Sequence, residues 1–167
     1  MQITMEGTPI DLMGQPLHVG DTLPHFVVRD TSLRPVSRED LKGPAVFLSV
    51  PSLDTGVCDL EVKRFHEQAS ALDGVAVHVV SMDLPFAQAR WCGANGIQAI
   101  KTYSDYYDHS FSLATGTRIE QLGLLARAVL VVNGQGKLTY VEYVPELTDH
   151  PNYHAAFSAL EALRRAN

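Results

Sequence analysis

The chain has 167 residues, of which 46% are hydrophobic and 19% are charged, and its formal net charge at pH 7 is −6. This composition excludes an intrinsically disordered chain, and the length suits one domain with a sizeable core. An acidic chain without a lysine or arginine cluster is not expected to bind nucleic acid or an anionic membrane surface. Its apolar stretches are also shorter than the ~20 residues that cross a bilayer.

The N-terminal segment predicts a hairpin. Residues 1–20 contain short alternating segments that are interrupted by Gly7 and Pro9 and again by Gly14 and Pro16, a pattern typical of two strands and their turns. The start of the chain has neither a basic region nor an apolar signal core, so we expect a cytoplasmic protein. We expect one domain over residues 1–167, with residues 1–20 as its hairpin extension.

Strands and helices alternate along the rest of the chain. Apolar or β-branched runs predict strands over 26–28, 45–50, 75–81, 100–103, 126–132 and 137–144. Helical spacing predicts helices over 60–72, 85–92 and 153–165. A strand, a cysteine at a helix start, a further strand and helix, and a final hairpin and helix predict the α/β class. We expect a thioredoxin-like fold with a mixed central sheet flanked by helices.

Two of these helices have predicted boundaries that the structure can test. In the helix over 60–72, the expected apolar face consists of Leu60, Phe65, Ala69 and Leu72. In the helix over 85–92, Pro85 stands near the start, and Gly93 is expected just beyond the end.

Cys58 is the candidate nucleophile. It follows a buried strand and Pro51, and it lies near the start of a helix, where free backbone N–H groups favour a thiolate. A thiolate can attack the O–O bond of a peroxide and become a sulfenic acid, which a second thiol can trap as a disulfide. Cys92 is the only other cysteine and the candidate second thiol. Two cysteines look more like a redox pair than the framework of a secreted protein.

Three further residues can complete such a site. Thr55 lies one helical turn before Cys58, where its hydroxyl can reach both sulfur and substrate, and Pro51 can shape the loop and shield the pocket from water. Arg127 lies in the most apolar run of the chain, where a guanidinium needs an anionic partner. A thiolate at a neighbouring strand end would be such a partner, and Arg127 would also polarise a bound peroxide.

Structural roles remain open for the same residues. An isolated cysteine is often an inert core residue, and Arg127 can equally pair with a structural carboxylate. Thr55 can serve as a helix cap and Pro51 as the end of a strand.

Elsewhere, His150 and His154 are a weak metal-binding pattern because Pro151 follows His150. The glycines at 134 and 136 predict a hairpin turn, because no helix follows them.

The motif Pro51-x-x-x-Thr55-x-x-Cys58 resembles the active-site signature of the peroxiredoxins. The longer string over 51–59 resembles the thiol peroxidase subfamily, the segment 86–92 resembles its resolving-cysteine helix, and the segment 124–129 resembles its active-site arginine strand. The resemblance covers essentially the whole chain. It departs mildly at Trp91, where phenylalanine is common, and at His66, where asparagine is common.

This resemblance implies a function for each residue. Cys58 would be the peroxidatic cysteine and Cys92 the resolving cysteine of the same chain, as in atypical two-cysteine peroxiredoxins, while Pro51, Thr55 and Arg127 would complete the active site. The protein would reduce hydrogen peroxide and alkyl hydroperoxides as an antioxidant enzyme. The family also implies thioredoxin as reductant, a homodimer, and no metal or organic cofactor.

Two other functions use the same thiols. A thiol–disulfide oxidoreductase acting on proteins is disfavoured, because the chain has no Cys-x-x-Cys motif. Thr55 occupies the position that the first cysteine of such a motif would take before Cys58. A redox sensor or binding module would oxidise slowly and would not sustain turnover with thioredoxin.

Overall fold

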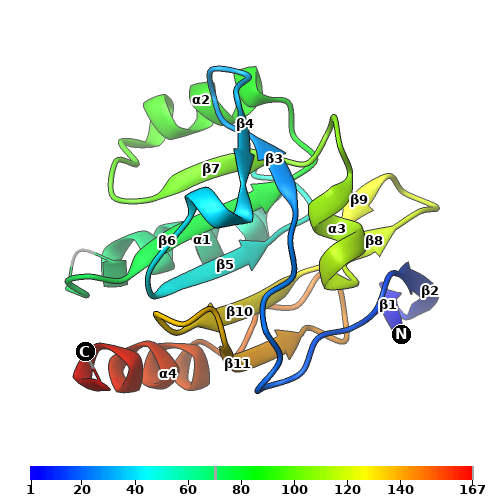
Figure 1. Cartoon of the computed structure of the whole chain (residues 1–167). Helices are drawn as coiled ribbons and strands as arrows, with labels where there is room; N and C mark the ends of the chain where they lie inside the picture. The colour runs from blue at the N-terminus through cyan, green and yellow to red at the C-terminus, as the bar shows by residue number, and fades with distance from the viewer. Residues whose placement is uncertain (70, 167) are drawn as a thin grey trace.

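The computed structural model describes residues 1–69 and 71–166, and a seven-stranded mixed sheet forms its centre (Figure 1). The strands stand in the order β11 (Leu138–Tyr143), β10 (Ala128–Val132), β5 (Ala45–Ser49), β6 (Ala76–Ser81), β7 (Lys101–Ser104), β3 (Val27–Arg29) and β4 (Pro35–Ser37). Strands β5, β6 and β7 are parallel, and the other neighbours are antiparallel. The loops that follow the three parallel strands therefore meet at one edge of the sheet.

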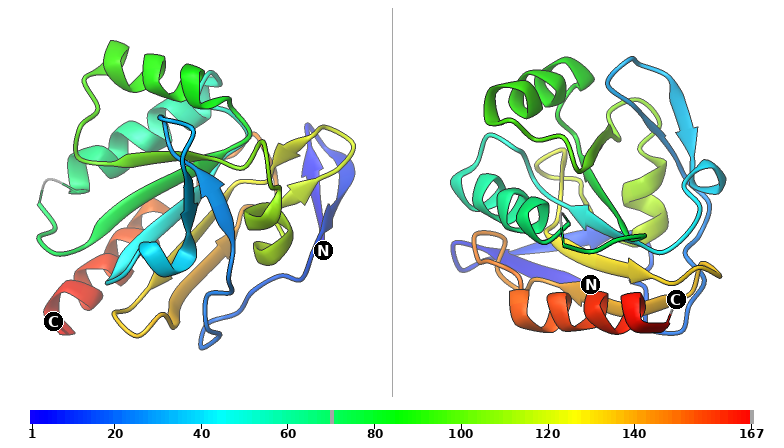
Figure 2. Two further views of the ribbon diagram at one scale, coloured as in Figure 1. Left: turned by 45° about the horizontal axis from the view of Figure 1, so that its top comes forward. Right: turned by 90° about the vertical axis from the view of Figure 1, so that its left-hand side faces the viewer.

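Helices cover both faces of this sheet (Figure 2). On one face, α1 (Gly56–Ala69) packs against β6, α2 (Pro85–Asn95) against β7, and α4 (Tyr153–Ala166) against β10 and β11. On the other face, the short α3 (Ser110–Thr115) contacts β3, and the 3-10 turn η1 (Arg38–Asp40) follows β4. No helix within the described ranges is long and apolar enough to cross a membrane.

A second, smaller sheet lies beside the first. The hairpin of β1 (Gln2–Met5) and β2 (Thr8–Met13) pairs with β8 (Arg118–Ile119) and β9 (Leu124–Leu125) in the order β1-β2-β8-β9 (Figure 1). Glu146, in the loop after β11, holds this hairpin in place. It accepts hydrogen bonds from the Gly7 backbone and the Thr4 hydroxyl, each at 2.9 Å. The backbone N–H groups of Thr148 and Gly7 are the main reason that the pKa of Glu146 falls to about 2.

The central strands contribute to two cores, because successive side chains of a strand point to opposite faces. Leu48, Val79 and Val129 lie fully buried under α1, α2 and α4, and Phe47 and Leu130 are buried on the α3 side. Each such side chain stabilises the fold by about 1.5–3 kcal/mol. Because both faces are covered, these strands form continuous apolar runs in the sequence.

The predicted α/β class, with its mixed central sheet, flanking helices and N-terminal hairpin, is confirmed. The predicted start of the first long helix is wrong, because α1 begins at Gly56 rather than at Leu60. Leu60 is 53% exposed and does not belong to the apolar face. That face is formed by Cys58, Val62 and Phe65, which follow helical spacing from the first turn onward.

The end of α2 also differs from the prediction. Gly93 lies inside the helix, which continues to Asn95, and Gly96 at φ +64° is the residue that ends it. The sequence analysis missed β4, α3, β8 and β9, which are too short to show a periodic pattern.

One buried histidine makes the fold sensitive to acid. His78 is 5% exposed, its ring lies 5.0 Å from that of Phe47 and 5.6 Å from that of Tyr103, and its Nδ1 has no hydrogen-bond partner among the described residues. Burial, with a smaller effect of Lys101, lowers the pKa of His78 to about 4. The folded protein therefore keeps this ring neutral at a pH where the unfolded chain protonates it.

We expect the free energy of unfolding to fall as the pH falls from 6.5 toward 4. The unfolded state binds the extra proton in this window, and the loss from His78 amounts to about 2 kcal/mol at pH 5. The His78→Leu variant should lack this part of the pH dependence. Urea unfolding of both proteins at pH 7 and pH 5 measures it, and parallel losses in the two proteins would contradict the assignment.

Candidate active site

Cys58 lies in the first turn of α1, at the edge of the sheet where the parallel strands end. Strand β5 leads to the buried Pro51, the chain turns through 52–55, and Cys58 is the third residue of the helix, with 0% of its surface exposed. The backbone N–H groups of a first helical turn lack intrahelical acceptors, so their dipoles favour an anion here. The structure thus places the sulfur as predicted, beside a helix start and shielded from water.

Arg127 reaches this sulfur from the opposite side. It stands between β9 and β10, where the chain passes from the small sheet to the large one, and its side chain is 2% exposed. Its Nη1 donates to Cys58 Sγ at 3.1 Å, while its Nε and Nη2 donate to the Leu147 carbonyl at 3.2 and 3.0 Å. The guanidinium is therefore fixed by the backbone and aimed at the sulfur, where it stabilises a thiolate.

Glu61, which the sequence analysis did not single out, is the second anionic partner of Arg127. Its Oε2 lies 2.7 Å from Arg127 Nη1, and its side chain is 0% exposed. The open question whether Arg127 pairs with the thiol or with a structural carboxylate is thus answered, because it pairs with both. The signal available in the sequence was the spacing of three residues between Cys58 and Glu61, which puts both on one helix face.

The charges of this group influence one another. Burial raises the pKa of Glu61 to about 7, although Arg127 works in the opposite direction. Burial also disfavours the charged form of Arg127, but Glu61 and Cys58 outweigh this effect and raise its pKa. The guanidinium therefore stays charged beside Glu61 and Cys58.

Asp83, also missed by the sequence analysis, holds the loop before Cys58. It lies between β6 and α2, accepts a hydrogen bond from the Ser52 hydroxyl at 2.7 Å, and accepts one from the Leu53 backbone at 2.9 Å. Ser81 donates to the same carboxylate at 2.8 Å. The loop after β5 is thereby tied to the loop after β6, a long-range contact that sequence spacing does not reveal.

The other two predicted residues lie in this loop. Pro51 is buried at its start, and the exposed Thr55 directly precedes α1. The Thr55 hydroxyl donates to the Ser52 carbonyl at 3.0 Å, and the Thr55 carbonyl accepts from the Asp59 backbone at 2.9 Å. Thr55 thus lies at the cap position of α1, one turn before Cys58.

Cys92 is not beside Cys58. It lies in α2 as a half-buried free thiol, and its Sγ donates to Thr102 Oγ1 on β7 at 3.9 Å. Burial raises the pKa of Cys92, and the hydrogen bond to Thr102 only partly opposes this. Cys92 is therefore held as a neutral thiol.

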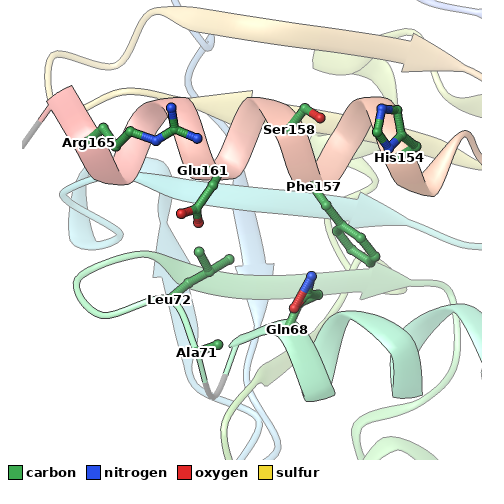
Figure 3. A pocket seen from close by; sticks show the side chains of 8 residues that line it. All are labelled: Gln68, Ala71, Leu72, His154, Phe157, Ser158, Glu161 and Arg165. Carbon is green, nitrogen blue, oxygen red and sulfur yellow. The ribbon is translucent and has the colours of Figure 1, made fainter.

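Two weaker candidates lie away from this site. His150 Nδ1 lies 2.7 Å from the Tyr153 hydroxyl, and His154 lines a surface cavity of 430 Å³ between α1 and α4 (Figure 3). Gln68 also lines this cavity. It lies ten residues along α1 from Cys58, which corresponds to about 15 Å at 1.5 Å per residue.

The segment 133–136 forms the turn between β10 and β11, as predicted.

Similarity to known proteins extends over most of the chain. The sequence model of the Redoxin family matches residues 18–157. The thiol peroxidase of Clostridium acetobutylicum is 49% identical over 98% of this chain and 100% of its own length, and that of Bacillus subtilis (strain 168) is 51% identical over 97% and 98%.

Solved structures give the same result for the fold. A peroxiredoxin-like protein from Aquifex aeolicus superposes with a TM-score of 0.88 at 38% identity over 97% of this chain and 96% of that one. The thiol peroxidase from Chromobacterium violaceum superposes with a TM-score of 0.90 at 18% identity over 100% and 99%, and its likeness concerns the fold alone. The predicted thioredoxin-like fold is confirmed. Since its relatives match nearly end to end, the chain belongs to the Redoxin family, as an enzyme of the thiol peroxidase group of peroxiredoxins.

Proposed function

We propose that the protein reduces hydrogen peroxide and alkyl hydroperoxides with Cys58 as the peroxidatic cysteine. The observation that carries this proposal is the 3.1 Å contact of Arg127 Nη1 with Cys58 Sγ in a buried site. The thiolate attacks one peroxide oxygen, an S–O bond forms as the O–O bond breaks, and the sulfur loses two electrons. The leaving oxygen departs as water or an alcohol once it has gained a proton.

Each neighbour of the sulfur has a proposed part in this step. Arg127 stabilises the charge that develops on the leaving oxygen, because a fixed donor in a dry site needs no reorganisation. A rotation of the Thr55 side chain away from the Ser52 carbonyl would offer its hydroxyl to the peroxide. Pro51, at the start of the loop, excludes water from the sulfur.

Cys92 is the proposed resolving cysteine. The sulfenic acid of Cys58 and the thiol of Cys92 would form an intramolecular disulfide and release water. Thr102 of β7 and Val129 of β10 stand in register with two strands between them, which corresponds to about 14 Å. Cys58 is hydrogen-bonded to Arg127, just before β10, and Cys92 is hydrogen-bonded to Thr102 of β7. A disulfide, by contrast, needs the two Cα atoms to lie within about 7 Å of each other.

The disulfide therefore requires a local change of conformation. We infer that the first turn of α1, the Cys92 end of α2, or both unwind after oxidation. Gly56 and Gly93 favour such unwinding, because glycine weakens a helix by about 1 kcal/mol relative to alanine.

Thioredoxin is the proposed reductant of this disulfide, and a homodimer is the proposed assembly. The apolar residues Leu84 and Phe86, at the start of α2, are exposed close to the active-site loop. Their exposure supports a protein–protein interface at this place. The cytoplasmic location stays a prediction.

Turnover in a coupled assay tests the proposed function. With thioredoxin, thioredoxin reductase and NADPH, either peroxide should drive sustained NADPH oxidation, and non-reducing mass spectrometry should find Cys58 joined to Cys92 within one chain. Slow oxidation without turnover would favour a redox sensor. Reduction of insulin disulfides would favour a protein oxidoreductase, and a disulfide found only between chains would overturn the assignment of Cys92.

A further inference from the structure

The side chains next to the two cysteines are hydrogen-bonded to each other. Asp59 directly follows Cys58, Trp91 directly precedes Cys92, and Trp91 Nε1 donates to Asp59 Oδ1 at 3.0 Å. We call this contact the Asp59–Trp91 bridge. It joins the first turn of α1 to α2, the two segments that carry the thiols.

Both ends of the bridge are held in place. Asp59 Oδ2 accepts from Lys63 Nζ, one turn further along α1, at 2.8 Å. The Trp91 side chain is 6% exposed and belongs to the core under α1, α2 and α4, and its carbonyl accepts from Asn95 Nδ2 at 2.8 Å. A partly buried N–H bonded to a carboxylate is among the stronger hydrogen bonds of a protein.

The position of the bridge connects it to the formation of the disulfide. Asp59 lies in the same helical turn as Cys58, so unwinding that turn displaces the carboxylate. Trp91 and Cys92 are consecutive residues of α2, so unwinding there displaces the indole. Whichever helix yields, a partner of the bridge moves before the two sulfurs can meet.

We propose that the Asp59–Trp91 bridge holds both cysteine-bearing segments in the reduced conformation and that its opening limits the rate of disulfide formation. This inference rests on the proposed roles of Cys58 and Cys92. Asp59 and Trp91 are then positioning residues, because they act on the sulfurs through the helices. While the bridge stays closed, the Cys58 sulfenic acid remains available to a second peroxide, which converts it to sulfinic acid and leaves as water or an alcohol.

Trp91 also provides the readout, because it is the only tryptophan in the chain. After rapid mixing with one equivalent of peroxide, the fluorescence of Trp91 should change at the rate at which the disulfide forms. In Cys92→Ser, which can form the sulfenic acid but no disulfide, the change should be absent.

Two variants open the bridge in different ways. Trp91→Phe removes the N–H donor and keeps an aromatic ring in the core, and Asp59→Ala removes the acceptor and keeps the fluorophore. Each should form the disulfide about tenfold faster than the parent, from the loss of one charge-assisted hydrogen bond. Each should also yield less sulfinic acid in excess peroxide. The rate of the first reaction of Cys58 with peroxide should change less than twofold.

Lys63→Gln is the matched control, because it removes the ion pair of Asp59 but leaves the indole N–H bond intact. It should form the disulfide at the parent rate. Unchanged or slower disulfide formation in both bridge variants would overturn the inference, whereas absence of the Cys58–Cys92 disulfide in the parent protein would instead overturn the proposed function. Faster disulfide formation together with a slower first reaction with peroxide would also overturn the inference, because it would indicate a loss of general packing.

Discussion

Cys58→Ser is expected to reduce peroxide consumption to the background rate, a loss of at least about 10³-fold. Serine preserves the size of the side chain and its place beside Arg127, but its hydroxyl stays protonated at neutral pH and its oxygen cannot take up the peroxide oxygen as sulfur does. The fold should persist, because one buried polar atom replaces another of similar shape. Stopped-flow measurement of peroxide loss, with circular dichroism to verify folding, tests this expectation.

Cys92→Ser is the control for this experiment. It should consume one equivalent of peroxide per chain at the parent rate and then stop, because the sulfenic acid forms but is not resolved. A dimedone adduct on Cys58 would identify that intermediate. Continued turnover by Cys58→Ser would contradict the assignment of the nucleophile, and an equally inactive Cys92→Ser would contradict the division of roles.

The second large effect is expected for Arg127→Met. The reaction with peroxide should slow by about 10²–10³-fold, since the fixed donor beside the sulfur is lost. The protein should also lose about 3–5 kcal/mol of its free energy of unfolding, because Glu61 remains buried without its cation. Stopped-flow kinetics and urea unfolding measure the two effects separately.

The stability loss in Arg127→Met should depend on pH in a defined direction. The folded protein raises the pKa of Glu61 from 4.5 to about 7 even with Arg127 present, and without Arg127 the shift grows. At pH values between the pKa of Glu61 in the unfolded chain and its pKa in the folded protein, only the folded state holds the extra proton. The free energy of unfolding therefore falls as the pH rises through this window. Near pH 4 both states are protonated, and most of the penalty disappears.

The double variant Arg127→Met with Glu61→Leu separates stability from chemistry. Replacing both members of a buried ion pair by apolar side chains is often neutral, so the free energy of unfolding should return toward the parent value. The reaction with peroxide should stay slow, because nothing replaces the donor to Cys58. Recovery of the rate in this variant would show that Arg127 acts only by stabilising the fold.

Much of this site could be predicted from the sequence, because its residues follow local rules. Cys58 stands at a helix start, and Arg127 interrupts an apolar run, where a charge needs a partner. Glu61 escaped notice because three residues of spacing on a helix are ordinary, and only tertiary packing buries its carboxylate. Asp83 depends on which loops meet at the sheet edge, and that follows from strand order, which one sequence does not fix.

The predicted start of α1 was wrong for a related reason. Leu60 fits an apolar pattern by residue type, yet it faces solvent, and the buried face of α1 includes the polar Cys58 and the charged Glu61. A polar side chain buried in the core interrupts the apolar pattern that predicts which residues form the core. The pattern is therefore least informative in the first turns of α1, where Cys58 and Glu61 are buried.

The attachment of the N-terminal hairpin has a consequence for the position of Arg127. Glu146 binds Thr4 and Gly7 of the hairpin, and the next residue, Leu147, supplies the carbonyl that holds the guanidinium of Arg127. Two consecutive residues thus link the extreme N-terminus to the cation that faces the sulfur. Deleting the first dozen residues, a routine step in recombinant production, would remove the partners of Glu146 and so weaken the position of the carbonyl that holds Arg127.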